Sequence, residues 1–422
     1  MKERNLDVSP TVSRVADDVI VELVYDVSKG KTALAVVQAG TISVVESFKT
    51  PAGQVLVPYS ATNNLIRNEC VVLASRPFTS GGKRELLKDI VTYLNRYVDL
   101  SPGFVQIAAH YVLLSWVYDA FNELPYLRFR GDFGTGKTRA LIAMGSVSYK
   151  GFFASGASTV SPIFHTLDSF GGTLVLDEAD LRFSDKSADI VKILNNGTVK
   201  GLPVLRSVQN RLKEFNPAAF RVFGPKIVSM RGSFRDRALE SRFLTEEMGG
   251  RAMRGDIPIQ LPNSLKDEAL ALRNRLLHFR LTDLFTIASD PERAIVGIEP
   301  RLNQTALSLL SLMDDNGPRE ELRQRLLRRN AEITAQRQTP ESRAFAAVAE
   351  AMRNSARTEV RLSEVAARMN AGNRIEGNIV TARDAARILR AHDFRLHKSN
   401  GNIVVRAPGV GDTGAPNADM AR

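Results

Sequence analysis

The N-terminal part of the chain carries short apolar runs that predict β-strands. Four runs rich in β-branched residues are separated by Gly, Lys, Thr and Pro within residues 19–75: IVELVYDV, TALAVVQAG, TISVVESF and CVVLAS. A turn at Ser80–Lys83 follows the last run. The pattern therefore predicts a β-rich region at the start of the chain, and it does not indicate what this region does.

From Arg84 the apolar positions change to a helical period. One face of the next segment carries Leu86, Leu87, Ile90, Val91, Leu94 and Val98. A second helix is predicted to begin after Ser101, with Pro102 in a favoured first-turn position, and to run to about Glu123. Its most apolar stretch, Phe104–Tyr118, has about 15 residues. A membrane-spanning helix needs ~20, so this stretch predicts a buried core helix.

Between Tyr126 and about Met230, apolar strands alternate with helical segments. The predicted strands are YLRFRG, GFFASG, TLVLDE and PKIVSM. This alternation is typical of a mainly parallel sheet with crossover helices, so the expected fold class is α/β. Residues 263–337 then follow an almost wholly helical pattern. Within them, the arginine-rich segment Pro318–Gln338 is consistent with either a solvated helix face or a nucleic-acid contact.

The segment GDFGTGKT, between a predicted strand and a predicted helix, matches G-x-x-x-x-G-K-[ST] in full. Its glycines let successive backbone N–H groups point at phosphate oxygens, and the helix N-terminus adds its positive dipole end. Lys137 is expected to reach the β- and γ-phosphates, and the Thr138 hydroxyl to bind Mg²⁺. The residues expected to contact ATP are Gly131, Asp132, Phe133, Gly134, Thr135, Gly136, Lys137 and Thr138.

A second motif, GGTLVLDEAD at Gly171–Asp180, places two carboxylates at the end of a hydrophobic strand. This is the pattern of a Walker B motif. Asp177 is expected to bind Mg²⁺, through water or via Thr138, and Glu178 to polarise the attacking water. ATP and Mg²⁺ are therefore the expected cofactors. The letters DEAD also name a helicase class with two recA-like domains, but this chain has one phosphate loop and no second α/β core after it.

The composition of the chain indicates which kinds of binding partner to expect. The 422 residues include 57 Lys and Arg against 46 Asp and Glu, a net charge of +11, which favours nucleic acid before an anionic membrane surface. A basic protein can also use its charge for solubility alone. The single cysteine, Cys70, excludes an internal disulfide and multi-cysteine metal sites, and the five histidines lack metal-ligand spacing. The N-terminus has no signal-peptide core, so we expect a soluble, cytoplasmic protein with no membrane partner.

With these motifs the chain resembles the AAA+ ATPases, and within them the ring helicases of the minichromosome-maintenance and superfamily 3 type. It looks most like the phage and mobile-element members with a C-terminal winged helix. The resemblance covers roughly Leu124–Arg406. The regions expected are a β-rich N-terminal domain (1–82), a helical connector (83–125), an AAA+ α/β core (126–255), a helical lid (256–338), a winged helix (339–406) and a disordered tail (407–422). The cysteines of a zinc-bearing N-terminal domain are missing.

The resemblance implies further catalytic residues. Either Ser229 or Arg231, at the end of a predicted strand, matches the polar sensor of the γ-phosphate. Arg242, in a Ser-Arg-Phe box, matches the arginine finger that reaches the nucleotide of a neighbouring subunit. Arg301, which opens a late helix, matches the lid arginine called sensor 2. Arg235 and Arg237 are rivals for the finger, and these two and Arg242 are also compatible with plain surface salt bridges. The alternative for Arg301 is an arginine at a helix N-terminus with no catalytic role.

An inserted hairpin is the DNA-tracking element of the helicase-type members. PVLRSVQ and AFRVFG are candidate strands of such a hairpin, with NRLKEFNPA as its tip. Arg211 and Lys213 then lie where the tip would contact phosphates in the ring channel. A plain surface hairpin is the alternative.

The C-terminal residues predict three helices and a hairpin. The helices are ESRAFAAVAEAMR, LSEVAARMN with Ser363 as N-cap, and TARDAARILRAHDF with Thr381 as N-cap. A hairpin follows, turning at Ser399–Gly401. This order resembles a winged helix, whose third helix enters the major groove. The expected DNA contacts are Arg383, Arg387 and Arg390 on that helix and Lys398 on the wing, although winged helices also mediate protein contacts.

Together these patterns predict an ATP-dependent DNA helicase or translocase that acts as a ring-shaped oligomer, a homohexamer, in the replication of a phage or mobile element. Single-stranded DNA would pass through the channel, and duplex DNA would bind the winged helix. The main alternative is a DNA-binding AAA+ initiator, loader or regulator whose ATP state controls assembly without unwinding. A protein remodeller is disfavoured by the basic charge and the winged helix.

Overall fold

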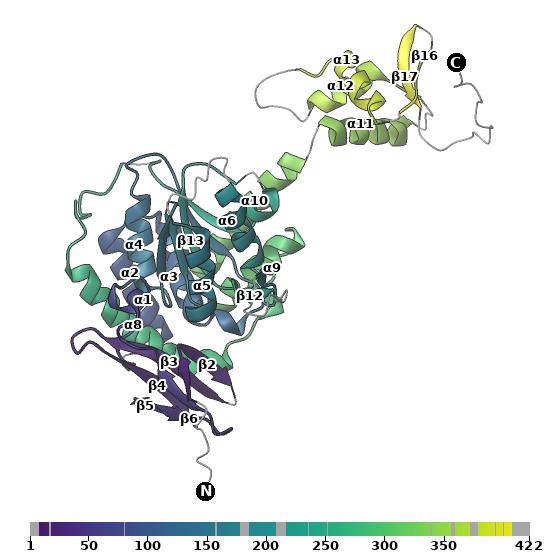
Figure 1. Ribbon diagram of the computed structural model, residues 1–422. Helices are drawn as coiled ribbons and strands as arrows, with labels where there is room; N and C mark the ends of the chain where they lie inside the picture. Colours follow the sequence, from purple (N-terminus) through teal and green to yellow (C-terminus); the bar gives the residue numbers. More distant parts are fainter. Residues whose placement is uncertain are drawn as a thin grey trace. The chain divides into compact units, whose positions relative to one another are not determined.

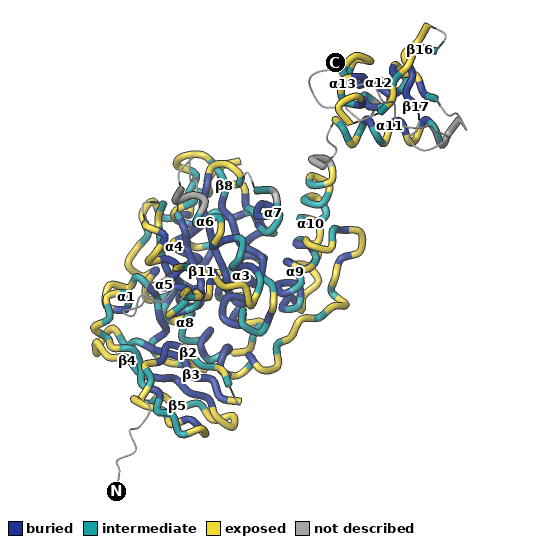
Figure 2. The backbone as a smooth tube through the Cα atoms, turned by 45° about the vertical axis from the view of Figure 1, so that its right-hand side comes forward, coloured by how far each residue is buried: buried dark blue, intermediate teal, exposed yellow. Residues whose placement is uncertain are grey.

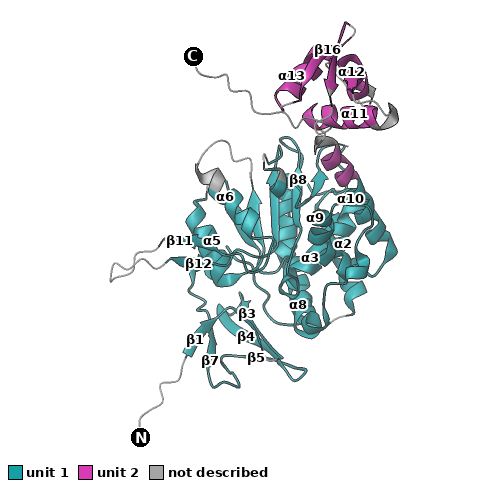
Figure 3. Cartoon of the chain, turned by 90° about the vertical axis from the view of Figure 1, so that its right-hand side faces the viewer, with its two compact units in different colours: residues 1–327 teal, residues 328–422 magenta. Residues whose placement is uncertain are grey.

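The computed structural model divides into two compact units, residues 1–327 and 328–422 (Figure 3). The residues that it describes are 8–16, 18–79, 81–156, 158–177, 185–207, 217–234, 236–250, 252–337, 340–355, 359–371, 379–392, 394–399 and 401–406.

The first unit opens with two small sheets. An antiparallel sheet has the order β2-β3-β4-β5, and a second sheet has the order β1-β7-β6, in which β1 runs parallel to β7. Alternate residues of β3 and β4 pack with Leu56 in a core of their own. The strands are β1 (Val8–Thr11), β2 (Ser13–Ala16), β3 (Val19–Asp26), β4 (Lys31–Gln38), β5 (Thr41–Val45), β6 (Phe48–Lys49) and β7 (Val55–Pro58).

The prediction of a strand at CVVLAS is wrong, because the structure, which describes these residues, has no strand there. A short helix, α1 (Asn64–Arg67), precedes it, and the segment itself contributes a single bridge, from Val71 to Phe152. Side chains from a distant helix bind its backbone instead: Arg273 Nε donates to the Leu73 carbonyl at 2.9 Å, and Asn274 Oδ1 accepts from the Ser75 amide at 2.9 Å. The strand prediction rests on β-propensity, which does not show that the Leu73 carbonyl and the Ser75 amide bond to side chains instead of to a neighbouring strand.

Two helices connect the sheets to the central domain. They are α2 (Lys83–Tyr97) and α3 (Pro102–Trp116). The prediction for α3 was too long, because the chain turns into a short 3₁₀ helix at Tyr118–Ala120. From Phe104 onward α3 is buried except at Gln106, as the dark blue tube in Figure 2 shows, so the expected core helix is confirmed. Within the described residues no helix has both the length and the apolar character to cross a membrane.

A parallel sheet that contains β13 forms the centre of this unit (Figure 1). Its five strands lie in the order β14-β8-β13-β10-β9. Four of its strands match the predicted ones, whereas β14 was not predicted. Helix α4 packs on one face, where Gly145 lies against Val175, and α5 and α6 cover the other face with Leu174 and Leu176. The strands are β8 (Tyr126–Arg130), β9 (Phe152–Ser155), β10 (Leu174–Asp177), β13 (Lys226–Met230) and β14 (Phe243–Glu247), and the helices are α4 (Lys137–Val147), α5 (Val160–Phe170), α6 (Asp185–Asn196) and α7 (Arg237–Glu240).

The predicted hairpin is present where the structure describes it. β11 (Val204–Arg206) pairs antiparallel with β12 (Ala218–Phe220). Its expected tip, with Arg211 and Lys213, lies outside the described residues.

The predicted helical region after residue 263 is also confirmed. It contains α8 (Ser264–Asp283), α9 (Pro300–Leu312) and α10 (Asn316–Arg337), with short 3₁₀ turns at Leu284–Thr286 and Pro291–Arg293.

A buried ionic group joins α8 to both the N-terminal sheets and the central domain. Glu22 of β3 pairs with Lys150 at 2.9 Å and with Arg280 of α8 at 2.8 Å. Burial raises the pKa of Glu22, but the two cations outweigh burial and bring it down to about 2. These charges hold three sequence-distant parts of the first unit together.

The second unit has the three predicted helices and the predicted hairpin, plus one unpredicted strand, β15. The strands pair antiparallel in the order β15-β17-β16. Thr381 caps α13 through a capping box with Asp384, as expected, whereas Ser363 lies inside α12 and does not cap it. The elements are α11 (Pro340–Ser355), β15 (Glu359–Arg361), α12 (Leu362–Ala371), α13 (Ala382–Arg390), β16 (Leu396–Ser399) and β17 (Asn402–Arg406).

Candidate nucleotide-binding site

The loop Gly131–Gly136 joins β8 to α4 at the carboxyl edge of the parallel sheet. Gly134 and Gly136 have φ angles of 72° and 88°, in the left-handed region that glycine adopts without strain. At Gly131 a Cβ atom would lie 2.4 Å from the Met248 carbonyl oxygen, so only glycine leaves room for the chain that follows β14. The three glycines of the motif therefore allow the curl of the loop.

The loop brings the first backbone amides of α4 and the Lys137 ammonium close together. Helix α4 begins at Lys137, and its N-cap, Gly136, has no side chain to satisfy the first amides of the helix. The Thr135 hydroxyl and the Lys137 ammonium both donate to the Asp132 carbonyl, at 2.8 and 2.5 Å, which holds the Lys137 side chain over the loop. Uncapped amides, a helix dipole and a lysine are the groups that bind phosphate.

The predicted metal ligands meet beside this loop. Thr138 Oγ1, in the first turn of α4, donates to Asp177 Oδ2 at 2.9 Å, and Ser229 Oγ donates to Asp177 Oδ1. Ser229 is fully buried at the end of β13. One carboxylate thus orients two hydroxyl groups from separate elements.

Strand order explains why these residues meet. β13 lies between β8, which leads into the loop, and β10, which ends in Asp177. The chain places β14 on the other side of β8, so the order of the strands reverses next to the loop. Ligands of open α/β sheets bind outside the carboxyl ends of the strands at such a switch point.

A hydroxyl and a carboxylate suit a hard cation. Mg²⁺ keeps several waters and is held by one or two protein ligands together with substrate phosphates, so Thr138 and Asp177 fit it. The described residues contain no group of three or more His, Cys, Asp and Glu that could hold a metal by themselves.

The structure separates the two sensor candidates. Whereas Ser229 contacts Asp177, Arg231 lies over the phosphate loop, with its Cζ 3.3 Å from the ring centroid of Phe133. The Phe133 ring is 75% exposed. A cation–π contact of this kind contributes ~0.5–1 kcal/mol at an exposed site and holds the guanidinium close to the loop.

Arg242 and Arg301 lie at the opposite edge of the sheet. The Arg242 carbonyl accepts from the amide of Tyr126, the first residue of β8, and its guanidinium donates to the Asn195 carbonyl. Burial lowers the pKa of Arg242, and the nearby Arg301 lowers it further. Glu123, which accepts from Gln304, is close enough to both arginines for each to lower its pKa, although burial outweighs them and the net shift is upward.

Several expected site residues fall outside the described part of the chain. These are Glu178, Arg235, Arg211 and Lys213, together with the side chain of Arg237. In the second unit, Arg383, Arg387 and Arg390 share the exposed face of α13, opposite the buried Ala385 and Leu389, and Lys398 is exposed on β16. The expected DNA-contact residues of that unit are thus on one helix face and one strand.

Sequence reasoning missed one ionic pair near the site. Arg128, in the middle of β8, makes two bonds of 2.6 and 2.7 Å to Glu240 of α7, and both side chains are buried. Glu240 also accepts from the Phe234 amide at 3.0 Å. A charged residue inside an apolar central strand was the available signal, because such a group needs a partner.

No protein-family model and no curated protein sequence matches the chain. Among solved structures, the chain is similar to the C-terminal region of NrS-1 in an apo form, with 11% identity over 92% of this chain and 96% of that one, at a TM-score of 0.36. It is similar to SCCmec type IV Cch, described as an active helicase, with 12% identity over 94% of each chain and a TM-score of 0.37. The chain is also similar to a full-length MCM homolog from Methanopyrus kandleri, with 12% identity over 76% of this chain and 71% of that one and a TM-score of 0.38.

The resemblance to helicases is confirmed in the sense that the solved structures similar to this chain include helicases. At TM-scores below 0.5 this likeness carries no further argument. The function is therefore argued from the residues of the chain itself.

Proposed function

We propose that this chain is an ATP-dependent DNA helicase or translocase that works as a ring-shaped oligomer, a homohexamer, in the replication of a phage or mobile element. In this proposal residues 126–255 are an AAA+ core, residues 256–338 its helical lid and residues 339–406 a winged helix. The observation that carries it is the division of the catalytic residues between two edges of one parallel sheet.

The carboxyl edge supports nucleotide binding. The loop Gly131–Thr138 would cradle the phosphates, with Lys137 against the β- and γ-phosphates. Thr138 and Asp177 would hold Mg²⁺, which neutralises charge on the phosphates, and Ser229 keeps Asp177 oriented. Glu178, the residue after Asp177, would polarise the attacking water.

The amino edge supports a ring. β8 has five residues, so its two ends are separated by ~17 Å at 3.3 Å per residue. Arg242 is bonded at the first residue of β8, whereas the phosphate loop begins after the last. Arg242 would therefore serve the nucleotide of a neighbouring subunit, and Arg301 would be the arginine of the helical lid. A contact that joins two different edges is head-to-tail, and such contacts form a ring when the rotation between successive subunits closes.

DNA contact is assigned to two places. The β11–β12 hairpin would carry Arg211 and Lys213 against a single strand in the ring channel. Arg383, Arg387, Arg390 and Lys398 would contact duplex phosphates. The net charge of +11 supports a polyanionic partner.

The first experiment measures ATP hydrolysis with and without single-stranded DNA, for the wild type and Glu178→Gln, with the oligomer mass read in the same samples. We expect strong stimulation by DNA in a ring-sized species and its disappearance in the variant. Hydrolysis that ignores DNA would contradict the motor and favour the ATP-switched initiator or loader. Absence of hydrolysis in every oligomer would contradict the ATPase assignment.

A mixing experiment tests the shared site. Lys137→Ala and Arg242→Ala are each expected to be inactive as pure rings. In an equal mixture, about one quarter of the interfaces combine an intact loop with an intact Arg242, so about a quarter of the activity should return. If mixed rings form by mass and remain inactive, the two residues do not act across subunits.

A further inference from the structure

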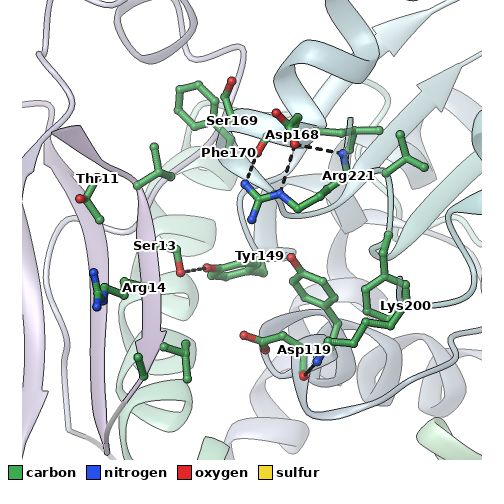
Figure 4. A pocket seen from close by; sticks show the side chains of 18 of the residues that line it. Thr11, Ser13, Arg14, Asp119, Tyr149, Asp168, Ser169, Phe170, Lys200 and Arg221 are labelled. Carbon is green, nitrogen blue, oxygen red and sulfur yellow. Dashed lines mark hydrogen bonds and ion pairs between the residues drawn. The ribbon is translucent and has the colours of Figure 1, made fainter. Parts of the chain in front are cut away.

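A cleft of about 1180 Å³ lies at the amino edge of the central sheet, away from the phosphate loop (Figure 4). Strands β1 and β2 line one side, and the C-terminal end of α5 and the residues after α6 and β12 line the other. Pockets for small molecules have ~300–1,000 Å³, so this cleft has room for more than one small ligand unit.

Three cations line this space from both sides. Lys200 and Arg221 project from one side, whereas the Arg14 side chain extends from the strand on the other side and away from Tyr149 (Figure 4). Arg14 Nη1 donates to Gln54 Oε1 at 2.7 Å, and Lys200 Nζ donates to the Asp119 carbonyl at 3.0 Å. Because both acceptors are uncharged, the two positive charges are not neutralised by them.

The acidic side chains of the cleft already have cationic partners. Asp119 accepts two bonds of 2.7 Å from Arg280, which is buried in the floor. Asp168 pairs with Arg221 at 3.1 Å, although the Arg221 side chain remains 82% exposed. The cleft therefore keeps a net positive charge from Arg14 and Lys200.

Aromatic rings lie between these charges. Tyr59, Tyr118 and Phe223 are half-buried in the lining, and Tyr118 packs against Phe223 with 5.7 Å between ring centroids. Cationic grooves with aromatic side chains bind single-stranded nucleic acids, because the charges follow the backbone and every base has a face that can stack.

The cleft also reaches the hairpin. Pro203, just before β11, and Ala219, within β12, belong to its lining, and Arg221 follows β12. The cleft therefore extends to the base of this hairpin, where β11 begins and β12 ends.

We propose that this cleft binds single-stranded DNA, with Lys200 and Arg221 against its phosphates. The proposal rests on the proposed function and extends it by placing a second stretch of the strand between the N-terminal sheets and the central domain. The cleft is thus a binding site distinct from the hairpin tip and from the α13 arginines.

The test measures binding of a fluorescein-labelled oligodeoxythymidylate by anisotropy over a series of salt concentrations, using the full chain. For Lys200→Ala/Arg221→Ala we expect binding that is weaker by roughly fivefold for each phosphate left without its cation near 0.1 M salt, and a salt slope smaller by about 1.4. Arg221→Lys, which keeps the charge, should bind the oligonucleotide with the affinity of the wild type.

Two matched controls lie outside the cleft. Lys266 and Arg84 are 75% and 87% exposed and each pairs with one carboxylate, as Arg221 does. Lys266→Ala and Arg84→Ala should leave both affinity and salt slope unchanged. Circular dichroism and ATP hydrolysis without DNA verify that every variant is folded.

The outcomes separate the two proposals. If the wild type binds and Arg211→Ala/Lys213→Ala weakens binding while the cleft variants do not, the cleft inference is overturned and the proposed function stands. If the cleft variants and the controls weaken binding equally, the effect is one of total charge and the inference also fails. If the wild type does not bind single-stranded DNA with or without ATP, the proposed function itself fails.

Discussion

Lys226 begins β13 and is completely buried, and no carboxylate of the described residues pairs with it. Its ammonium donates to the carbonyls of Val222 at 2.8 Å and Gly224 at 3.0 Å, and lies 5.0 Å from the ring centroid of Tyr126. Gly197 makes this possible, because a Cβ atom there would lie 2.3 Å from the Lys226 Nζ. Burial lowers the pKa of Lys226 to about 7.

We predict that Lys226 makes the stability of the first unit depend on pH. Between pH 7 and the ordinary lysine pKa, the unfolded chain binds a proton that the folded chain releases, so the free energy of unfolding rises with pH. From pH 7 to 9 the rise attributable to Lys226 is about 2 kcal/mol. Denaturant unfolding at both pH values should show this difference between the wild type and Lys226→Met. An identical pH dependence in both proteins would contradict it, and Lys200→Met serves as the exposed control.

At the scale of elements, Glu240 connects helix α7 to strand β8 and to the segment that follows β13. It pairs with Arg128 of β8, accepts from the amide of Phe234 after β13, and belongs to α7, two residues before Arg242. Arg128 also donates to Thr245 of β14 at 3.0 Å. This pair therefore fixes the segment that positions Arg242 relative to the strand that leads to the phosphate loop.

We predict that Glu240→Gln destabilises the first unit by about 3–5 kcal/mol, because it leaves the Arg128 charge buried without a counter-charge. Replacing both partners, as Arg128→Met/Glu240→Leu, should cost much less than the single change. Thermal or denaturant unfolding measures both. Glu247→Gln is the matched control, since its partner Arg130 is 30% exposed, and it should cost at most ~1 kcal/mol. A double variant as unstable as the single one would contradict this account.

At the scale of the whole molecule, the chain distributes its tasks between two units. The candidate nucleotide-binding site and the cleft are built within residues 1–327, and the α13 arginines belong to residues 328–422. The second unit has its own core, formed by its three helices with Val360 and Val405. Substitutions of exposed residues in one unit should therefore leave the packed core of the other unit intact.

We predict that Arg383→Ala/Arg387→Ala/Arg390→Ala weakens duplex DNA binding and leaves ATP hydrolysis without DNA unchanged. The salt slope should fall by ~0.9 for each phosphate that the protein no longer neutralises. The side chains are exposed, so the unit should remain folded. Titration of labelled duplex DNA and a parallel hydrolysis assay measure the two effects. Unchanged duplex binding would remove α13 from the DNA interface and favour a protein contact.

The sequence by itself determined the features that lie within one continuous segment. The glycine-rich loop motif, the apolar strand before Asp177, the buried helix α3 and the three helices and hairpin of the second unit all follow from patterns within short runs of neighbouring residues, whereas β15 does not. Capping at Thr381 was local as well, and it is confirmed.

Only the tertiary structure decided which distant segments meet. It brought Ser229 to Asp177 and Arg231 to Phe133, placed Arg242 beside Arg301, and paired β14 with β8. The error at CVVLAS has the same origin, because side chains about 200 residues away bind the Leu73 carbonyl and the Ser75 amide. Strand order, buried ion pairs and clefts arise from contacts between segments that no local period encodes, and so they appear only in the folded chain.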